Sequence, residues 1–147
     1  MRANAPAYLD AVEGDFLLSA RVEVDFVSAF DAGALVLWGD EQTWAKLAFE
    51  CSPAIEPMVV SVVTRGISDD CNSVVVDGNA VWLRIARIAP AYAFHMSTDG
   101  ERWSFVRHFR LDGDLQVGFE AQSPTGGGCT ARFSEIRFEA ATLSELR

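Results

Sequence analysis

Two short stretches of the sequence combine a tryptophan with a cation two residues further on. The first is Trp44 with Lys46, and the second is Trp82 with Arg84. In an extended strand, residues two apart point to the same face and lie about 6.6 Å apart. Each pair can therefore present an aromatic ring beside a hydrogen-bond donor. Indole rings stack on the C–H faces of pyranose sugars and charged groups bind sugar hydroxyls, so these residue types point to carbohydrate binding.

Both pairs lie in segments whose apolar residues alternate with the pair. In residues 43–50 the alternation directs Phe49 to the protein core, and in residues 81–88 it does the same for Leu83. We therefore predict that the two pairs share one concave surface, away from Phe49 and Leu83. The predicted ligand-binding residues of this surface, with the last of them at its rim, are Trp44, Lys46, Trp82, Arg84 and Glu50.

A second interpretation of the same residues requires no ligand. Each ring can pack beneath the neighbouring cation as a cation–π pair, which is worth about 0.5–2 kcal/mol. If a sugar does bind, Lys46 and Arg84 favour acidic or hydroxyl-rich ligands. The sequence leaves both interpretations open.

Catalytic and metal-binding patterns are weak. Glycosidases place two carboxylates about 5–9.5 Å apart, and Glu50 is the only acidic residue that we place on the predicted surface. Asp69, Asp70 and Asn72 could offer oxygen atoms to Ca²⁺, although polar residues in a turn more often form a solvated loop. His95 and His108 have no cysteine or histidine partner at zinc spacing. We predict no catalytic residue, no metal site and no cofactor.

Residues 97–103 resemble the hairpin of a sialidase-type Asp-box, with one residue missing after Asp99. We expect Asp99 to accept backbone N–H bonds, Gly100 to adopt a positive φ, and Trp103 to cover the turn. This role is structural.

The elements that position these residues are predicted to be strands. Turn signals recur every 8–12 residues, which is typical of sandwiches and barrels. Only residues 143–147 could form a helical turn. The expected strands are residues 16–26, 34–38, 43–50, 58–64, 72–76, 81–88, 92–97, 104–110, 115–121 and 130–139. The sequence therefore predicts an all-β fold, a two-sheet antiparallel jelly-roll sandwich of the concanavalin A-like type.

Length and composition set further bounds. A chain of 147 residues with 50% hydrophobic residues fits a single domain, residues 1–147. A net charge of -9 disfavours nucleic acid and anionic membrane surfaces as partners. No apolar run is long enough to span a bilayer, and the first residues lack a secretory signal. The three cysteines have no CxxC spacing, so we expect free thiols in a reducing, cytoplasmic environment.

Several segments together resemble a known family. They are residues 32–36, 44–50, 61–64 with 68–69, 82–84, 97–103 and 117–124, in this order. Their pattern is similar to the regulation-of-enolase family, also classified as domain of unknown function 1349. The resemblance covers residues 14–138. It implies a concanavalin A-like jelly roll with lectin-like relatives, and it implies no activity.

Three functions are consistent with these observations. The first is a non-catalytic protein-interaction or regulatory domain, the second a weak carbohydrate-binding module that uses the concave face, and the third a glycan-processing enzyme. The expected partners are a protein or a carbohydrate. Because sandwiches have open edge strands, we also predict a homodimer.

Overall fold

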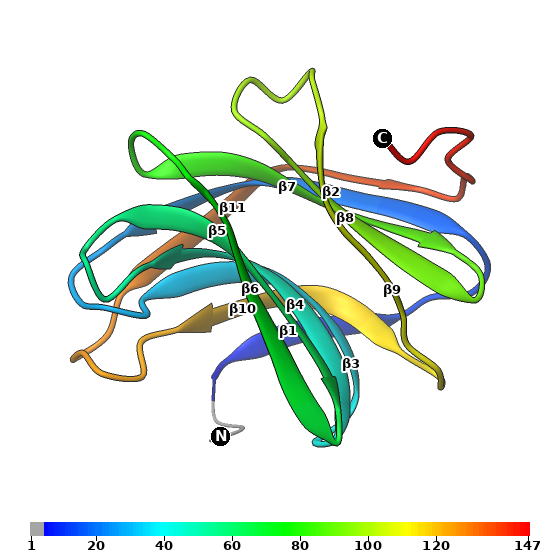
Figure 1. Cartoon of the computed structure of the whole chain (residues 1–147), viewed down its shortest axis with the longest axis horizontal. Coiled ribbons are helices and arrows are strands. Elements are labelled where there is room, and N and C mark those ends of the chain that lie inside the picture. The colour runs from blue at the N-terminus through cyan, green and yellow to red at the C-terminus, as the bar shows by residue number, and fades with distance from the viewer. Residues whose placement is uncertain (1–4) are drawn as a thin grey trace.

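The computed structural model describes residues 5–147, and every regular element in this part of the chain is a β-strand. The strands form two antiparallel sheets that pack face to face (Figure 1). The strands are β1 (Ala7–Ala11), β2 (Phe16–Asp25), β3 (Ala32–Asp40), β4 (Thr43–Cys51), β5 (Pro57–Arg65), β6 (Ile67–Val75), β7 (Ala80–Ile88), β8 (Ala91–Ser97), β9 (Ser104–Arg110), β10 (Gln116–Gln122) and β11 (Thr130–Glu139). The all-β sandwich predicted from the sequence is confirmed.

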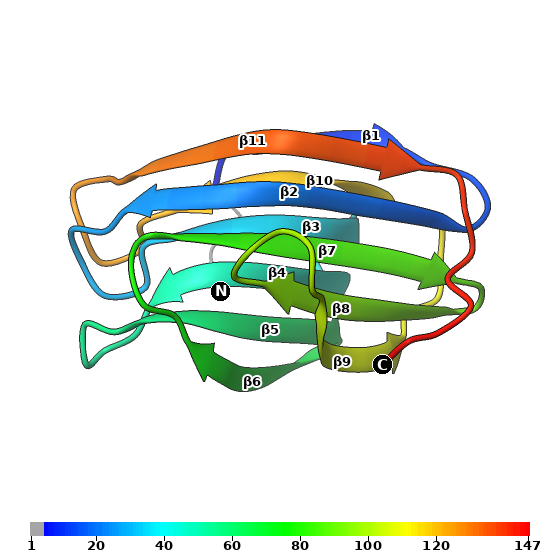
Figure 2. The same ribbon diagram turned by 90° about the horizontal axis from the view of Figure 1, so that it is seen from above.

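The two sheets differ in size and membership. The six-stranded sheet has the order β1-β10-β3-β4-β5-β6, and the five-stranded sheet has the order β11-β2-β7-β8-β9. Figure 2 shows β6 and β9 at one open side of the sandwich, and β1 and β11 at the other. A bond from Arg107 Nη1 to the carbonyl oxygen of Asp69, 3.0 Å long, joins the edges formed by β9 and β6.

Strict alternation in the strands builds the core between the sheets. In β2, every second residue from Phe16 to Val24 is buried, while the residues between them are partly exposed. Leu47 and Phe49 of β4 meet Leu83 of β7 in the same apolar cluster. The sequence predicted this inward face, because aliphatic and aromatic residues at a period of two favour a half-buried strand.

Apart from small shifts at strand ends, three parts of the chain differ from the prediction. Strand β1 was missed, because its five residues are mostly exposed and carry no clear alternation. Strand β6 begins at Ile67, so Asp69 and Asp70 lie in a strand paired with β5 and not in a turn. Residues 143–147 form no helical turn. Their chain lies against the five-stranded sheet, where the Leu146 carbonyl contacts the ring of His95.

The part of the chain that the structure describes contains no helix that is both long and apolar enough to cross a membrane.

Gly118 allows β1 to approach β10 closely. A Cβ atom at this position would lie 1.8 Å from the carbonyl oxygen of Tyr8 in β1. We expect Gly118→Ala to displace β1 and to lower the free energy of unfolding by about 1–3 kcal/mol, the usual cost of overpacking. Hydrogen exchange should become faster in residues 7–11. Gly127→Ala is the matched control, because nothing lies within 4 Å of its added Cβ; equal effects in both variants would contradict this account.

Candidate functional site

The two tryptophan–cation pairs lie on different sheets. Trp44 and Lys46 belong to β4 of the six-stranded sheet, and Trp82 and Arg84 belong to β7 of the five-stranded sheet. Each pair points away from the core, as predicted, but the two outer faces are on opposite sides of the sandwich. The predicted shared surface is therefore wrong. Alternation determines which face of its own sheet a side chain occupies, but not which sheet the strand joins.

The outer face of the six-stranded sheet carries a groove of about 1050 Å³. Trp44, Lys46 and Glu50 all line it, as the sequence analysis expected of this half of the site. Other strands and loops contribute further aromatic, amide and carboxylate groups: Phe30, Trp38, Asp70, Glu120 and Gln122. This groove is the candidate functional site.

Lys46 is the central charge of the groove and is only 6% exposed. Its Nζ donates to Gln122 Oε1 at 2.5 Å and lies 3.8 Å from Glu120 Oε1. Both partners belong to β10, so the lysine side chain crosses β3, which lies between β4 and β10. The residues of β3 that pair with Gln122 and Glu120 are Ala32 and Ala34, whose short side chains leave room for the crossing.

Gln122 extends this contact into a network. Its Nε2 donates to Glu50 Oε2 at 3.2 Å and to the carbonyl oxygen of Phe30 at 3.0 Å. Phe30 has a φ of 67° and lies within a turn in which the backbone N–H groups of Val27 and Ser28 donate to Asp31. The amide of Gln122 therefore fixes both the glutamate and the loop at one end of the groove.

Glu50 titrates abnormally in this setting. Burial raises the pKa of its carboxyl group, the attraction of Lys46 opposes the rise, and repulsion from Asp70 adds to it. Glu50 is therefore easier to protonate in the folded protein than in the unfolded chain.

The two tryptophans of the groove differ in exposure. The Trp44 ring is only 5% exposed, although it faces outward, and the Lys46 ammonium lies 5.9 Å from its centroid. Its register partner across the β3–β4 pair is Trp38, which is half-buried. Trp38 thus offers the more accessible ring, and Trp44 supports it.

Sequence reasoning did not assign Trp38, Glu120, Gln122 or Asp70 to this surface. Trp38 could have been found only by recognising a β-bulge, because a regular two-residue turn at residues 41–42 would pair it with Ala45. The register shift between Trp38 and Asp40 places it opposite Trp44 instead. Glu120 and Gln122 could not have been found, since they reach the groove only through the pairing of β10 with β3. The expectation that Glu50 is the only acidic residue of the surface is wrong: Asp70 and Glu120 also line the groove.

No group of three or more histidine, cysteine or acidic side chains within residues 5–147 is arranged to hold a metal ion. Asp69, part of the weak calcium pattern, instead pairs with Arg65 at 3.2 Å. Cys51, Cys71 and Cys129 are free.

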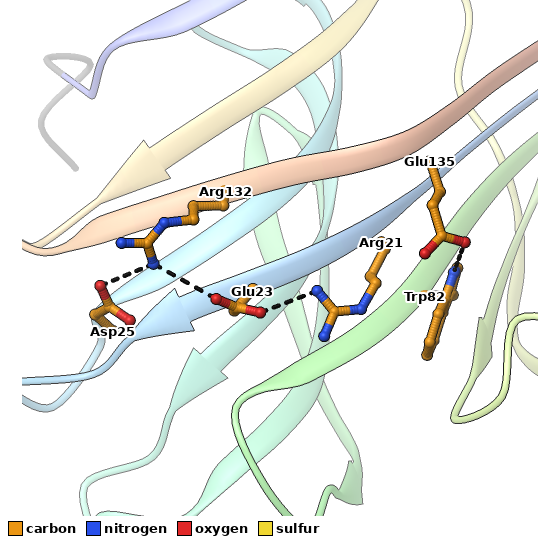
Figure 3. A network of polar contacts seen from close by, with 6 residues as sticks. All are labelled: Arg21, Glu23, Asp25, Trp82, Arg132 and Glu135. Carbon is orange, nitrogen blue, oxygen red and sulfur yellow. Dashed lines mark hydrogen bonds and ion pairs between the residues drawn. The ribbon is translucent and has the colours of Figure 1, made fainter.

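The opposite face carries Trp82 and Arg84 in a different environment. Figure 3 shows a chain of polar contacts here, in which Arg132 bridges Asp25 and Glu23, and Glu23 binds Arg21. Trp82 Nε1 donates to Glu135 Oε2 at 3.1 Å (Figure 3). The cation over the Trp82 ring is Arg21, at 5.4 Å from the centroid, and Arg84 instead stacks on Trp103.

The loop that carries Trp103 has the geometry expected of it. Asp99 Oδ1 accepts the backbone N–H groups of Glu101 and Arg102, both at 2.8 Å, and Gly100 has a φ of 77°. These backbone bonds, with a smaller contribution from Ser97, lower the pKa of Asp99 to about 2. The structural role predicted for Asp99 and Gly100 is confirmed.

Comparison with known proteins identifies relatives of the whole sandwich. Residues 1–141 match the family described as "Protein of unknown function (DUF1349)". A functionally unknown protein from Saccharomyces cerevisiae superposes with a TM-score of 0.81 at 27% sequence identity, covering 92% of this chain and 73% of that one. Among curated proteins, none matches the chain significantly.

Two more distant structures share the fold. A GH43 protein from Bacillus licheniformis has a TM-score of 0.77 at 13% identity, and the match covers 88% of this chain but only 28% of that one. The carbohydrate-binding module CBM66 from Bacillus subtilis has a TM-score of 0.59 at 15% identity, covering 86% and 76% of the two chains. At these identities the likeness concerns the fold alone.

The raised pKa of Glu50 leads to a prediction about stability. Because the folded-state pKa lies above the unfolded-state value, folding favours the protonated carboxyl, and stability is lost as pH rises through these two values. We expect Glu50→Gln to become more stable relative to the parent as pH increases from 4 to 7. Urea unfolding at several pH values measures this, with the exposed Glu56→Gln as control. A difference from the parent that is independent of pH would contradict the assignment.

Proposed function

The chain belongs to the DUF1349 family, which is described only as proteins of unknown function, so its ligand has to be inferred from the groove. We propose that the groove binds neutral oligosaccharides and that the protein does not cleave them. The observation that supports this proposal is the groove itself, with a volume of about 1050 Å³ and with aromatic rings beside convergent polar groups. A solvated, partly aromatic groove suits a ligand with apolar ring faces and hydroxyl edges.

The charge of the groove favours neutral over acidic sugars. Among the described residues 5–147, its charged lining consists of Lys46 against four carboxylates, Glu41, Glu50, Asp70 and Glu120. The lysine and the Gln122 amide already donate to partners within the protein. Among residues 5–147, no hydrogen bond occupies Glu50 Oε1 or the Asp70 carboxylate. The available groups are therefore mainly acceptors, which suit hydroxyl donors and repel anions.

Cleavage of the sugar is the least supported function. The groove does hold several carboxylates, and Glu50 has the raised pKa of a general acid. However, Lys46 pairs with Glu120, and Gln122 donates to Glu50, so both carboxylates are already bound within the sheet. Release of reducing ends from the oligosaccharides used below would show that the protein is an enzyme and would overturn the non-catalytic proposal.

A protein-interaction role is the second candidate, and strand β6 favours it. All nine residues of this edge strand are exposed, including Ile67, Val74 and Val75. The partner that fits best is a second copy of the chain. Antiparallel pairing centred on Cys71 would place Ile67 opposite Val75 and Asp70 opposite Asn72, which joins apolar residues and separates the acidic ones. A regulatory role, such as that implied by the regulation-of-enolase designation, would use this edge.

The sugar proposal predicts different effects for the two tryptophans of the groove. Trp38→Ala should abolish binding with little loss of stability, because its half-buried ring is the stacking surface. Trp44→Ala should lower the free energy of unfolding by about 3–5 kcal/mol, since its ring is packed. Titration of neutral and uronic oligosaccharides, followed by tryptophan fluorescence, should give dissociation constants of about 0.1–1 mM for the neutral ones.

Trp82→Ala is the matched control, because Trp82 lies on the other sheet. It should bind neutral oligosaccharides as tightly as the parent does. If Trp38→Ala keeps the parent's affinity, or if only uronic oligosaccharides bind, the proposal is wrong.

The homodimer proposal makes its own prediction. Multi-angle light scattering should report twice the mass of the chain at high concentration, and Ile67→Lys should give a monomer because it places a solvated charge in the pairing edge. Val27→Lys is the control, since Val27 is similarly exposed but lies outside β6. A parent protein that stays monomeric at every concentration would rule out pairing through β6.

A further inference from the structure

A small pocket of about 100 Å³ lies on the outer face of the five-stranded sheet, separated from the groove by the whole sandwich. It forms where the loop of residues 97–103 folds back over β7. Trp82 and Arg84 of β7 line it together with Gly100 and Trp103 of the loop. Strand β11 contributes Glu135, Arg137 and Glu139. The pocket thus joins the second tryptophan–cation pair to a second indole ring, that of Trp103.

No described residue forms a hydrogen bond with the Arg84 guanidinium in this pocket. Its Cζ lies 4.3 Å from the centroid of the Trp103 ring, so the guanidinium is held by stacking. Its Nε is buried without a partner, and no hydrogen bond or ion pair among residues 5–147 involves Arg84. Burial lowers the pKa of Arg84, while the charge of Glu139 opposes this. A partly desolvated guanidinium whose N–H groups have no acceptor is destabilised, so an acceptor that binds these groups is favoured.

The surroundings keep this part of the face accessible. The C-terminal segment covers the neighbouring part, because the ring of His95 donates to the Leu146 carbonyl at 2.9 Å and Arg147 lies 5.2 Å from the Phe105 ring centroid. His95 is the register partner of Arg84 on β8, so the covered part ends beside the pocket. The indole N–H of Trp82 is already bound to Glu135, which leaves the ring as an apolar wall.

Gly100 completes the pocket. A Cβ atom at this position would lie 2.9 Å from the Trp82 ring, and the residue has a φ of 77°. Only glycine lets the loop approach Trp82 this closely and still turn back toward Arg84.

We propose that this pocket binds the carboxylate group of a small ligand, with the Arg84 guanidinium donating to both oxygens. A planar guanidinium binds a carboxylate through two parallel N–H···O bonds, which no neutral group matches. Arg137 adds a second positive charge at the pocket, and the Glu139 carboxylate is the internal competitor of the ligand. The proposal does not depend on sugar binding in the groove. The carboxylate can come from a free organic acid or from an acidic sugar.

The test follows the four tryptophan indole N–H signals by ¹⁵N–¹H correlation spectroscopy, after assignment with single Trp→Phe variants. Acetate and glucuronate are titrated at constant ionic strength, with chloride as the balancing anion and glucose as the neutral control. We expect the Trp82 and Trp103 signals to shift and reach saturation with either acid and to stay fixed with glucose. Similar affinities would identify a free acid as sufficient, and a tighter affinity for glucuronate would identify an acidic sugar as the source.

Variants of the pocket make the assignment specific. Arg84→Lys keeps the charge and the contact with Trp103 but loses the planar fork, so the affinity should fall about tenfold, the equivalent of one charge-assisted hydrogen bond. Arg84→Met should abolish saturation. Glu139→Gln should raise the affinity because it removes the competing carboxylate, and Glu56→Gln, far from the pocket, should leave it unchanged.

Shifts that remain linear in acid concentration, or that persist in Arg84→Met, would overturn the proposal. These outcomes are independent of the groove, because neutral oligosaccharides report through Trp38 and Trp44. Failure of the sugar proposal would leave those two signals fixed, whereas failure of the carboxylate proposal would leave the Trp82 and Trp103 signals fixed.

Discussion

The buried ammonium of Lys46 is the constraint on which the groove depends. An ammonium group removed from water costs several kcal/mol unless oxygen atoms surround it. Here the oxygens come from Gln122 and Glu120 of β10, two strands away. The lysine must therefore cross β3, and the alanines of that strand and of β4 form a small apolar cluster beneath the polar network. The small residues leave the space that the lysine side chain crosses, and the polar network covers them. Together they form the floor of the groove.

The two outer faces of the sandwich have opposite requirements for a ligand. In the groove, the donors of Lys46 and Gln122 are used internally, and carboxylate oxygens remain for the ligand. In the Arg84 pocket, the Trp82 donor is used internally and a guanidinium remains. One face therefore suits hydroxyl donors and the other an anionic acceptor. The charged lining of that pocket balances Arg84 and Arg137 against Glu135 and Glu139. Its affinity for an anion therefore depends on the guanidinium of Arg84, which is held by stacking on Trp103, while Glu135 is bound to Trp82.

The local part of this architecture could be predicted from the sequence, and the non-local part could not. Alternation in residues 43–50 and 81–88 correctly oriented Trp44, Lys46, Trp82 and Arg84 away from the core. It could not tell that β4 and β7 join different sheets, because membership depends on pairings such as β2 with β7, between segments that lie far apart in the chain. Glu120 and Gln122 were missed for the same reason. Trp103 was assigned to its turn, but its contact with Arg84 requires the loop to fold back over β7.

The contrast between Trp38 and Trp44 shows how the groove could bind a weakly interacting ligand without losing order. An exposed indole that is free to rotate would lose conformational entropy when a sugar stacks on it, which weakens binding. Trp44 is packed under the Lys46 ammonium, and Trp38 lies beside it in the same β-hairpin. Rotation of the Glu50 side chain would break its hydrogen bond with Gln122. Rotation of the Gln122 side chain would also break its bond to the Phe30 carbonyl. The side chains that would contact a sugar are therefore held in place before it arrives, so a modest number of contacts can suffice for binding.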